Sequence, residues 1–121
     1  MRGSVVLSAG ERPGSRWELD VLSGWWERLR GLLGTGPGAR PVLLLRCRSV
    51  HTVGMRYPLD LAFVGERGEV LRVSRGVPPG RVMSCGGASC VIERPATGGE
   101  WVEEGQHLWV TSLCVSLLCG R

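Results

Sequence analysis

A carboxylate inside a strand with two apolar faces is the feature that most constrains this chain. The strand is predicted over 59–64, directly after Pro58, which forces the preceding residue into an extended conformation. Apolar side chains alternate onto both faces of this strand, so we expect both faces to be covered. Asp60 interrupts the pattern. An isolated carboxylate is costly to bury, so Asp60 requires a charged or hydrogen-bonding partner.

Two basic side chains, Arg56 and His51, lie just upstream of the proline corner and are candidate partners. If the corner brings these groups together, they form a pocket in which Arg56 grips a small polar or anionic ligand and Asp60 orients it. The same pair is equally typical of a structural ion pair that fixes a corner of the sheet. Glu93 closes a later apolar strand, and its carboxylate either faces the same cleft or caps a following helix. The predicted ligand-binding residues are His51, Met55, Arg56, Asp60 and Glu93.

These residues support two functional hypotheses. The first is a non-catalytic or accessory module that binds a small polar or anionic ligand, or a partner's peptide, in a charged cleft. The alternative is a hydrolase-like enzyme that uses Asp60 or Glu93 as a general acid or base. The sequence has neither the usual metal-ligand spacing nor a phosphate-binding loop, so we expect no metal and no cofactor. A lone histidine on a half-buried strand is more often structural than catalytic, which favours the binding module.

Four stretches of the chain match the motifs of one known family. They are the signature strand with its proline corner (55–63), an upstream helical motif (27–34), the hairpin turn Glu66-Arg67-Gly68 and the later strand Cys90-Val91-Ile92-Glu93. Together they make the chain resemble a small prokaryotic family known only as domain of unknown function family one hundred ninety-two. The similarity spans about 17–108, which is the length of one domain. That family has no agreed activity, so the resemblance implies no catalytic role.

One position departs from the resembled family. Gln106 follows Gly105, where the family usually has Asp, so the resemblance implies no acidic role there. The last residues, 109–121, match no motif of the family. Their apolar run over 113–119 fits a covered strand or a packed helix equally well, and it is a candidate oligomer contact.

Periodicity and turn residues predict an α+β fold, with a small antiparallel-rich sheet that is strongly curved or closed as a barrel, and two short helices packed on it. The first helix is expected to begin after Ser23, to pack the stripe Trp26, Leu29 and Leu33, and to end at Gly34. The second is expected to begin with a capping box over 97–100 and to end at 105. Strands are expected over 5–7, 17–22, 42–47, 51–55, 59–64, 69–73, 81–84, 89–93 and 107–111, with a hairpin between 59–64 and 69–73 and a second pairing between 81–84 and 89–93.

The length of 121 residues fits one domain that buries a core without metals or disulfides. The chain has a net charge of +4, contains no lysine, and has its fifteen arginines spread evenly along the sequence. Because no basic stripe or nucleic-acid motif is present, we do not expect nucleic-acid binding. The odd count of five cysteines favours reduced thiols buried as small apolar groups, although a bridge between Cys85 and Cys90 is an alternative.

The beginning of the chain has too short an apolar run for a signal peptide, and no segment is long enough to span a bilayer. These features predict a cytoplasmic protein, although members of the resembled family often carry export signals.

Overall fold

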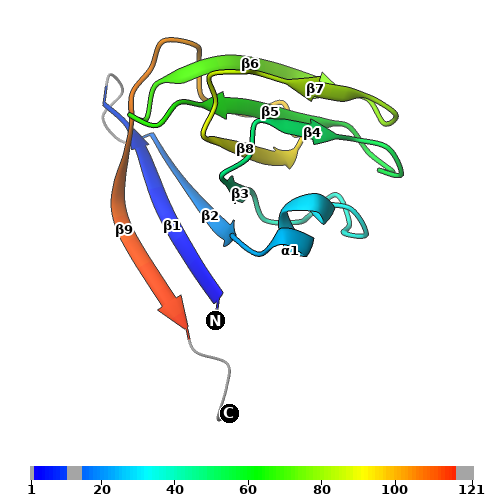
Figure 1. Ribbon diagram of the computed structural model, residues 1–121, viewed down its shortest axis with the longest axis horizontal. Helices are drawn as coiled ribbons and strands as arrows, with labels where there is room; N and C mark the ends of the chain where they lie inside the picture. Colours follow the sequence, from blue (N-terminus) through cyan, green and yellow to red (C-terminus); the bar gives the residue numbers. More distant parts are fainter. Residues whose placement is uncertain (1, 11–14, 117–121) are drawn as a thin grey trace.

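Strands are the main regular structure of the molecule, as a computed structural model of residues 2–10 and 15–116 shows (Figure 1). The elements in chain order are β1 (Arg2–Ala9), β2 (Arg16–Leu22), α1 (Trp25–Arg30), β3 (Val42–Leu45), β4 (Ser49–His51), β5 (Leu59–Val64), β6 (Val70–Val77), β7 (Val82–Ser84), β8 (Cys90–Pro95) and β9 (Leu108–Ser116). Seven strands form one sheet in the order β6-β5-β8-β3-β2-β1-β9, and β4 pairs with β7 in a second, two-stranded sheet. All pairings are antiparallel except β2 with β3, so the antiparallel-rich sheet is confirmed.

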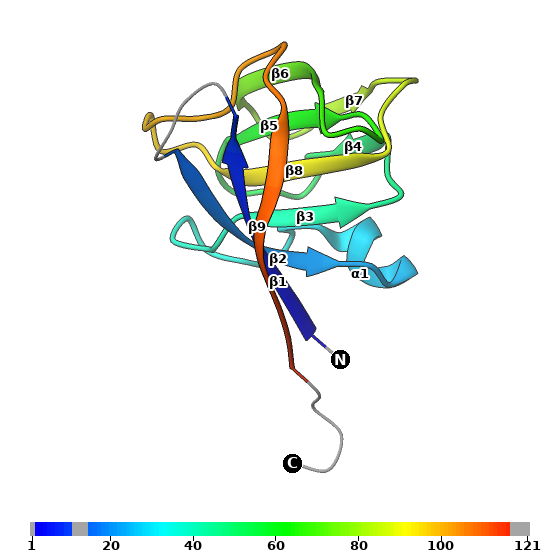
Figure 2. The ribbon, with the colours of Figure 1, turned by 90° about the vertical axis from the view of Figure 1, so that its left-hand side faces the viewer.

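The seven-stranded sheet is strongly curled, so that its two ends approach each other. The turn between β5 and β6 reaches the start of β9, where the Leu108 amide donates to the Gly68 carbonyl over 2.9 Å and Glu69 bridges to His107. Figure 2 shows the β1 and β9 ribbons crossing the direction of β5 and β8. The curl closes at this end only, which makes the sheet barrel-like without closing it along its whole length.

Each face of the central strands carries its own hydrophobic core. The inner core lies within the curl and consists of Val5, Leu7, Ala9, Trp17, Leu19, Leu43, Ala62, Val64, Val70, Ile92, Trp101, Val102 and Leu108. The outer core lies on the opposite face and consists of Leu32, Val42, Leu44, Val50, Met55, Leu59, Leu61, Phe63, Val77 and Val91. The β4–β7 pair and the turn after α1 supply the cover for the outer core. All six residues of β5 are buried, so the prediction of a strand covered on both faces is confirmed.

The first helix is shorter and more exposed than its apolar stripe predicts. It covers Trp25–Arg30, its N-cap is Gly24, and none of its residues is buried. Trp26 and Leu29 are exposed, so the prediction that they pack on the sheet is wrong. The helix ends at Gly31, whose φ of 53° turns the chain away from the helical path. The turn that follows, rather than the helix, inserts Leu32 into the outer core.

The predicted second helix is absent from the described part of the chain, because residues 97–105 form a loop. A capping box requires the Glu100 carboxylate to reach back to the backbone at Thr97. Instead, the Glu100 carboxylate accepts a hydrogen bond from the Ser15 hydroxyl, 85 residues away in the sequence. Gly98, with φ of 77°, and Gly99 also oppose a helix here. Trp101 anchors the loop by entering the inner core.

Two predicted strand arrangements differ from the structure. Residues 52–55 form a turn, so the strand expected over 51–55 is instead β4, which ends at His51. The pairing expected between 81–84 and 89–93 is also wrong, because β7 pairs with β4 while β8 lies between β3 and β5. The hairpin of β5 and β6 is confirmed. Part of the apolar run, 113–116, belongs to β9, and residues 117–119 lie outside the described residues.

Across 2–10 and 15–116, none of the helices has the length and apolar character needed to cross a membrane. Among the cysteines that the structure describes, Cys47, Cys85 and Cys90 are free thiols. Burial raises the pKa of the Cys90 thiol to about 11, which keeps it protonated at neutral pH.

The two aromatic environments predict a large effect of mutation on stability at one position and a small effect at the other. Phe63 is fully buried in the outer core, whereas Trp26 is 63% exposed. We expect Phe63→Ala to lower the free energy of unfolding by about 3–5 kcal/mol, because it removes transfer free energy and leaves a cavity. We expect Trp26→Ala to change it by about 0.5 kcal/mol or less. Urea denaturation followed by circular dichroism measures both values, and a large loss for Trp26→Ala would contradict the exposed position of α1.

Candidate functional site

The register between β5 and β8 places the two predicted acids on opposite faces of the sheet. Asp60 lies opposite Arg94, and Leu61 lies opposite Glu93. Because side chains alternate along a strand, Asp60 and Arg94 share the inner face, while Glu93 shares the outer face with Leu61. The prediction that one cleft contains both Asp60 and Glu93 is therefore wrong. Each acid has to be considered in its own surroundings.

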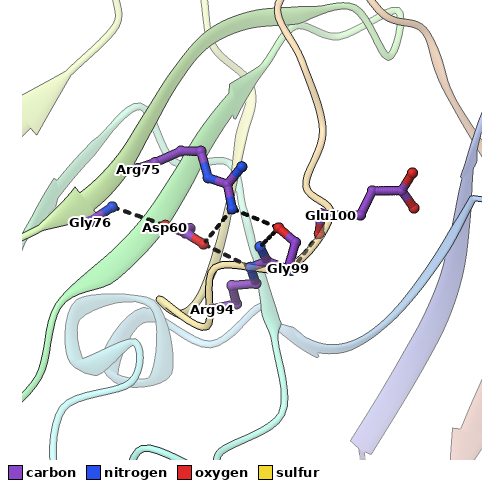
Figure 3. A network of polar contacts seen from close by, with 6 residues as sticks. All are labelled: Asp60, Arg75, Gly76, Arg94, Gly99 and Glu100. Atoms are coloured by element: carbon purple, nitrogen blue, oxygen red, sulfur yellow. Dashed lines mark hydrogen bonds and ion pairs between the residues drawn. The ribbon is translucent and has the colours of Figure 1, made fainter.

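Asp60 is the buried centre of a polar network on the inner face (Figure 3). Its side chain is 2% exposed, and its Oδ2 accepts a hydrogen bond from Arg94 Nε at 2.9 Å. Oδ1 accepts a second hydrogen bond from the Gly76 amide at 2.9 Å, and Arg75 Nη2 lies 3.9 Å from Oδ2. The expectation that Asp60 needs a partner is confirmed. The expected partner is wrong, because the arginines are 94 and 75, and Arg56 is exposed to solvent.

The Arg94 guanidinium ties the same network to the loop that replaces the second helix. Its Nη1 and Nη2 donate to the carbonyls of Glu100 and Gly99 at 2.6 and 2.9 Å. The guanidinium carbon also lies 4.4 Å from the centre of the Trp101 ring, a cation–π contact. One buried cation therefore satisfies a carboxylate, two backbone carbonyls and an aromatic face.

A β-bulge supplies the remaining donor to Asp60. The register between β5 and β6 shifts between Leu59 and Leu61, so that Arg75 and Gly76 form extra length opposite Asp60. Gly76 has φ of 63°, which a glycine adopts without strain, and its amide turns toward the carboxylate. With its donors in place and its surface closed, Asp60 has the character of a structural ion pair. It lacks the solvent access that a general acid or base requires.

Glu93 lies on the outer face, beneath the turn that follows α1. It is 3% exposed, and the Leu32 backbone amide donates a hydrogen bond to it. Burial raises its pKa from the usual 4.5 to about 7, and this hydrogen bond opposes the rise. Gly31 makes the close approach possible, because a Cβ there would lie 2.7 Å from Glu93 Oε1. The turn therefore packs closely over the Glu93 carboxyl group, whose pKa of about 7 leaves it partly protonated at neutral pH.

A small hollow of about 50 Å³ adjoins this carboxyl group. Its lining residues are Arg28, Leu29, Arg30, Gly31, Leu32, Ser49, Val50, His51, Met55, Leu59 and Glu93. Two buried polar atoms of the lining, His51 Nδ1 and Arg28 Nε, lack a hydrogen-bond partner among the described residues. The Arg28 side chain is held in place by another of its guanidinium nitrogens, Nη1, which donates to the carbonyls of Leu45 and Arg46 at 3.2 and 2.8 Å. Buried polar atoms are rarely left without a partner, so the hollow is a candidate binding site.

Three of the five predicted site residues meet at this hollow, and two do not. His51, Met55 and Glu93 line it, whereas Asp60 lies in the network on the opposite face and Arg56 is exposed. The sequence analysis missed Arg28, which contributes the basic group that Arg56 was expected to supply. The sequence contains one indication of Arg28, because this residue lies three positions before Gly31, the glycine at which the helix ends. Its partners, Leu45 at the end of β3 and Arg46 directly after it, are 17 and 18 residues away, and the sequence does not reveal them.

Two larger hollows lie nearby. A groove of about 410 Å³ shares Arg30, Gly31 and Leu32 with the small hollow, so the turn after α1 separates them. An open hollow of about 400 Å³ lies beside Arg75 and Trp101, on the side of the Asp60 network. Of the described residues that line these two hollows, only Trp101 has a buried polar side-chain atom without a partner, its Nε1. The small hollow therefore combines the most unsatisfied polar groups in the least space.

Within residues 2–10 and 15–116, no cluster of three or more His, Cys, Asp or Glu side chains has a geometry suited to a metal ion. The chemistry available at the hollow is that of a carboxyl group, an imidazole and guanidinium groups.

Comparisons with known proteins identify the fold. Two crystal structures are similar: a protein of unknown function from Novosphingobium aromaticivorans DSM 12444, with a TM-score of 0.68 and 17% identity over 88% of this chain and 84% of that chain; and a protein from Sinorhizobium meliloti 1021, provisionally described as a transcription regulator, with a TM-score of 0.71 and 18% identity over 91% and 94%. The chain matches no established family profile and no curated protein. At these identities, the similarity extends to the fold alone.

The Asp60 network predicts a large loss of stability when its charge is removed. In Asp60→Asn, Arg94 stays buried without a counterion, so we expect the free energy of unfolding to fall by about 3–5 kcal/mol. Glu18→Gln is the matched control, because the ion pair of Glu18 with Arg40 is more than half exposed on both sides and is expected to contribute about 1 kcal/mol or less. Urea unfolding of the two variants measures the contrast. Equal effects would mean that Asp60 is not a structural anchor.

The raised pKa of Glu93 predicts a pH-dependent stability with a definite sign. Between pH 4.5 and about 7, the unfolded chain releases the Glu93 proton while the folded protein retains it. Stability therefore falls as the pH rises through this window, by about 3 kcal/mol from this group, and the fall levels off above it.

The measurement is the difference in unfolding free energy between the wild type and Glu93→Gln across pH 4–8. Gln keeps the acceptor for the Leu32 amide but does not ionise in this range, so the variant is expected to lack this part of the slope. Parallel profiles for the two proteins would show that the Glu93 carboxyl group titrates normally.

Proposed function

We propose that this protein is a non-catalytic binding module, and that its ligand places a small anionic group in the hollow beneath the turn after α1. The observation that carries the proposal is that three residues lining the hollow are the buried acid Glu93 and two residues with an unsatisfied buried atom, His51 (Nδ1) and Arg28 (Nε). A bound group that satisfies these atoms recovers the desolvation free energy that they lose in the folded protein.

The charge of the hollow favours an anion. Arg28 and Arg30 each carry a full positive charge, whereas burial holds the pKa of Glu93 at about 7, so its average charge at neutral pH is well below one. An acceptor oxygen of the ligand would take the Arg28 Nε–H. In its protonated form, Glu93 would donate its O–H to a second oxygen. A carboxylate provides two such oxygens at the required proximity to each other.

The volume of the hollow limits what enters it. About 50 Å³ of accessible space accommodates roughly three or four water-sized groups, so a whole drug-sized molecule does not fit. We infer that a carboxylate, free or at the end of a larger molecule, occupies the hollow while the rest of the ligand lies outside. The apolar lining by Met55, Leu59 and Leu32 would shield the ion from water and strengthen its contact with Arg28.

A second proposal keeps the hydrolase-like alternative for Glu93 alone. A carboxyl group with a pKa of about 7 is well matched to general acid–base work at neutral pH. Asp60 does not share this role, because its oxygens are engaged and its surface is closed. The two proposals differ in turnover. A panel of ester and glycoside substrates would support an enzyme only if product formed and if Glu93→Gln reduced the rate by about a hundredfold or more.

We further propose that the chain is a divergent member of domain of unknown function family one hundred ninety-two. The signature over 55–63 supports this membership, and two of its positions, Met55 and Leu59, line the hollow.

An NMR titration with formate and acetate tests the binding proposal. We expect saturable shifts at the His51 ring and at the Leu32 amide, and binding weakened by about tenfold in Arg28→Gln, because a charge-assisted hydrogen bond is lost. Arg67→Gln is the matched control, since it removes the same charge from the exposed β5–β6 turn. Native mass spectrometry of the purified protein adds a search for a co-purified acid.

Shifts that never saturate, or equal weakening in the two arginine variants, would contradict a site in the hollow and leave only general attraction of anions to a basic protein.

A further inference from the structure

The outer edge of β9 is open and carries no protecting charge. β9 is the last strand of the seven-stranded sheet, and its sequence Leu-Trp-Val-Thr-Ser-Leu-Cys-Val-Ser contains neither a charged residue nor proline. Only its first residue is covered at this edge, where the Leu108 amide bonds to the Gly68 carbonyl. From Trp109 onward, the edge has no strand partner among the described residues. Uncharged open edges are templates for pairing with another strand.

The other edge of the sheet shows the protection that β9 lacks. β6 carries Arg72 and Arg75, and residues 104–106 cover part of its outer side. The Glu104 carboxylate accepts from the Val73 amide at 3.2 Å, and the Gln106 carbonyl accepts from the Val70 amide at 2.8 Å. Charge and a covering segment therefore block pairing at β6, whereas beyond Leu108 the described residues provide neither at the edge of β9.

Exposed apolar side chains accompany the open edge. Val110 and Leu113 are 63% and 66% exposed, although they lie opposite Leu7 and Val5, which are buried in the inner core. Val110 and Leu113 lie on the same face of the sheet because β9 contains one extra residue, Thr111, at a bulge. The Thr111 hydroxyl donates to the Val6 carbonyl there. In Figure 2, β1 and β9 extend together beyond the rest of the sheet. The inner apolar face thus continues along β9 past the point where the curl covers it.

We propose that β9 pairs antiparallel with β9 of a second copy of this chain, forming a two-fold symmetric dimer. Two identical strands placed antiparallel are self-complementary about a two-fold axis, and in this strand no charge meets a like charge. An axis between Thr111 and Ser112 sets Val110 of one copy beside Leu113 of the other, twice. The second copy then covers both exposed residues and satisfies the backbone groups of the edge, and the pairing leaves no new open edge at β9.

Sedimentation equilibrium of the full chain, over a concentration series up to its solubility limit, tests this proposal. The wild type is expected to be dimeric. Leu113→Lys and Val110→Glu each place an unpaired charge at the new interface, and we expect each to weaken dimerisation by about tenfold or more. Leu71→Lys on β6 is the control, since it adds the same charge to an exposed site on the other edge and should leave the dimer unchanged.

Mixing the two β9 variants tests the register. A heterodimer of Leu113→Lys with Val110→Glu brings the lysine beside the glutamate and keeps one Val–Leu pair, so it should form more strongly than either variant's homodimer. Circular dichroism confirms that each variant is folded. A monomeric wild type would overturn the proposal, as would a dimer that Leu113→Lys and Leu71→Lys weaken equally. If the mixture is no stronger than the separate variants, the proposed axis is wrong.

Discussion

The register between β5 and β8 decides which face of the sheet each charged side chain of these two strands occupies. Both strands are buried on both faces, so a charge on either strand must find its partner on the face to which the register assigns it. The observed register sets Asp60 beside Arg94 and Glu93 beside Leu61. A slip of one residue would send every one of these side chains to the opposite face. The ion pair and the alternation of apolar residues therefore favour the same alignment of the two strands, and both disfavour a shifted register.

The same register gives two neighbouring strands two very different carboxyl groups. Asp60 has two hydrogen-bond donors and a further arginine nearby, which compensate for its burial. Glu93 has one backbone donor, from Leu32, and burial dominates, so its proton is retained up to about neutral pH. The first group contributes rigidity, because every contact it makes is already formed. The second retains unfulfilled bonding capacity beside two other incompletely bonded groups, which is the condition under which a ligand gains most from entering.

Local sequence rules predicted the elements that local physics decides. The bounds of β5 and its hairpin with β6 follow from alternating apolar residues between Pro58 and a glycine turn, and the structure agrees. The second helix failed because Glu100, its capping residue, bonds to Ser15 at a distance of 85 positions. The partner of Asp60 was missed for the same reason, since Arg94 is 34 positions away while Arg56 is four. Contacts formed only by the folded sheet are not encoded in the spacing of any one segment.

The stability of the turn after α1, which covers the hollow, is linked to the protonation of Glu93. α1 contributes no buried side chain, so the turn is held by Leu32 in the outer core and by the hydrogen bonds of Arg28 to the carbonyls of Leu45 and Arg46. The ionised form of Glu93 is less favourable when buried beneath this turn than in water, and its pKa is raised for this reason. By linkage, an interaction that stabilises the ionised carboxylate lowers this pKa, and an interaction that accepts a hydrogen bond from the neutral acid raises it. An anion bound beside Glu93 acts in the second way, so its affinity must increase as the pH falls through 7. A bound cation would reverse that dependence, which makes the sign of the pH effect a direct report of the charge that the hollow accepts.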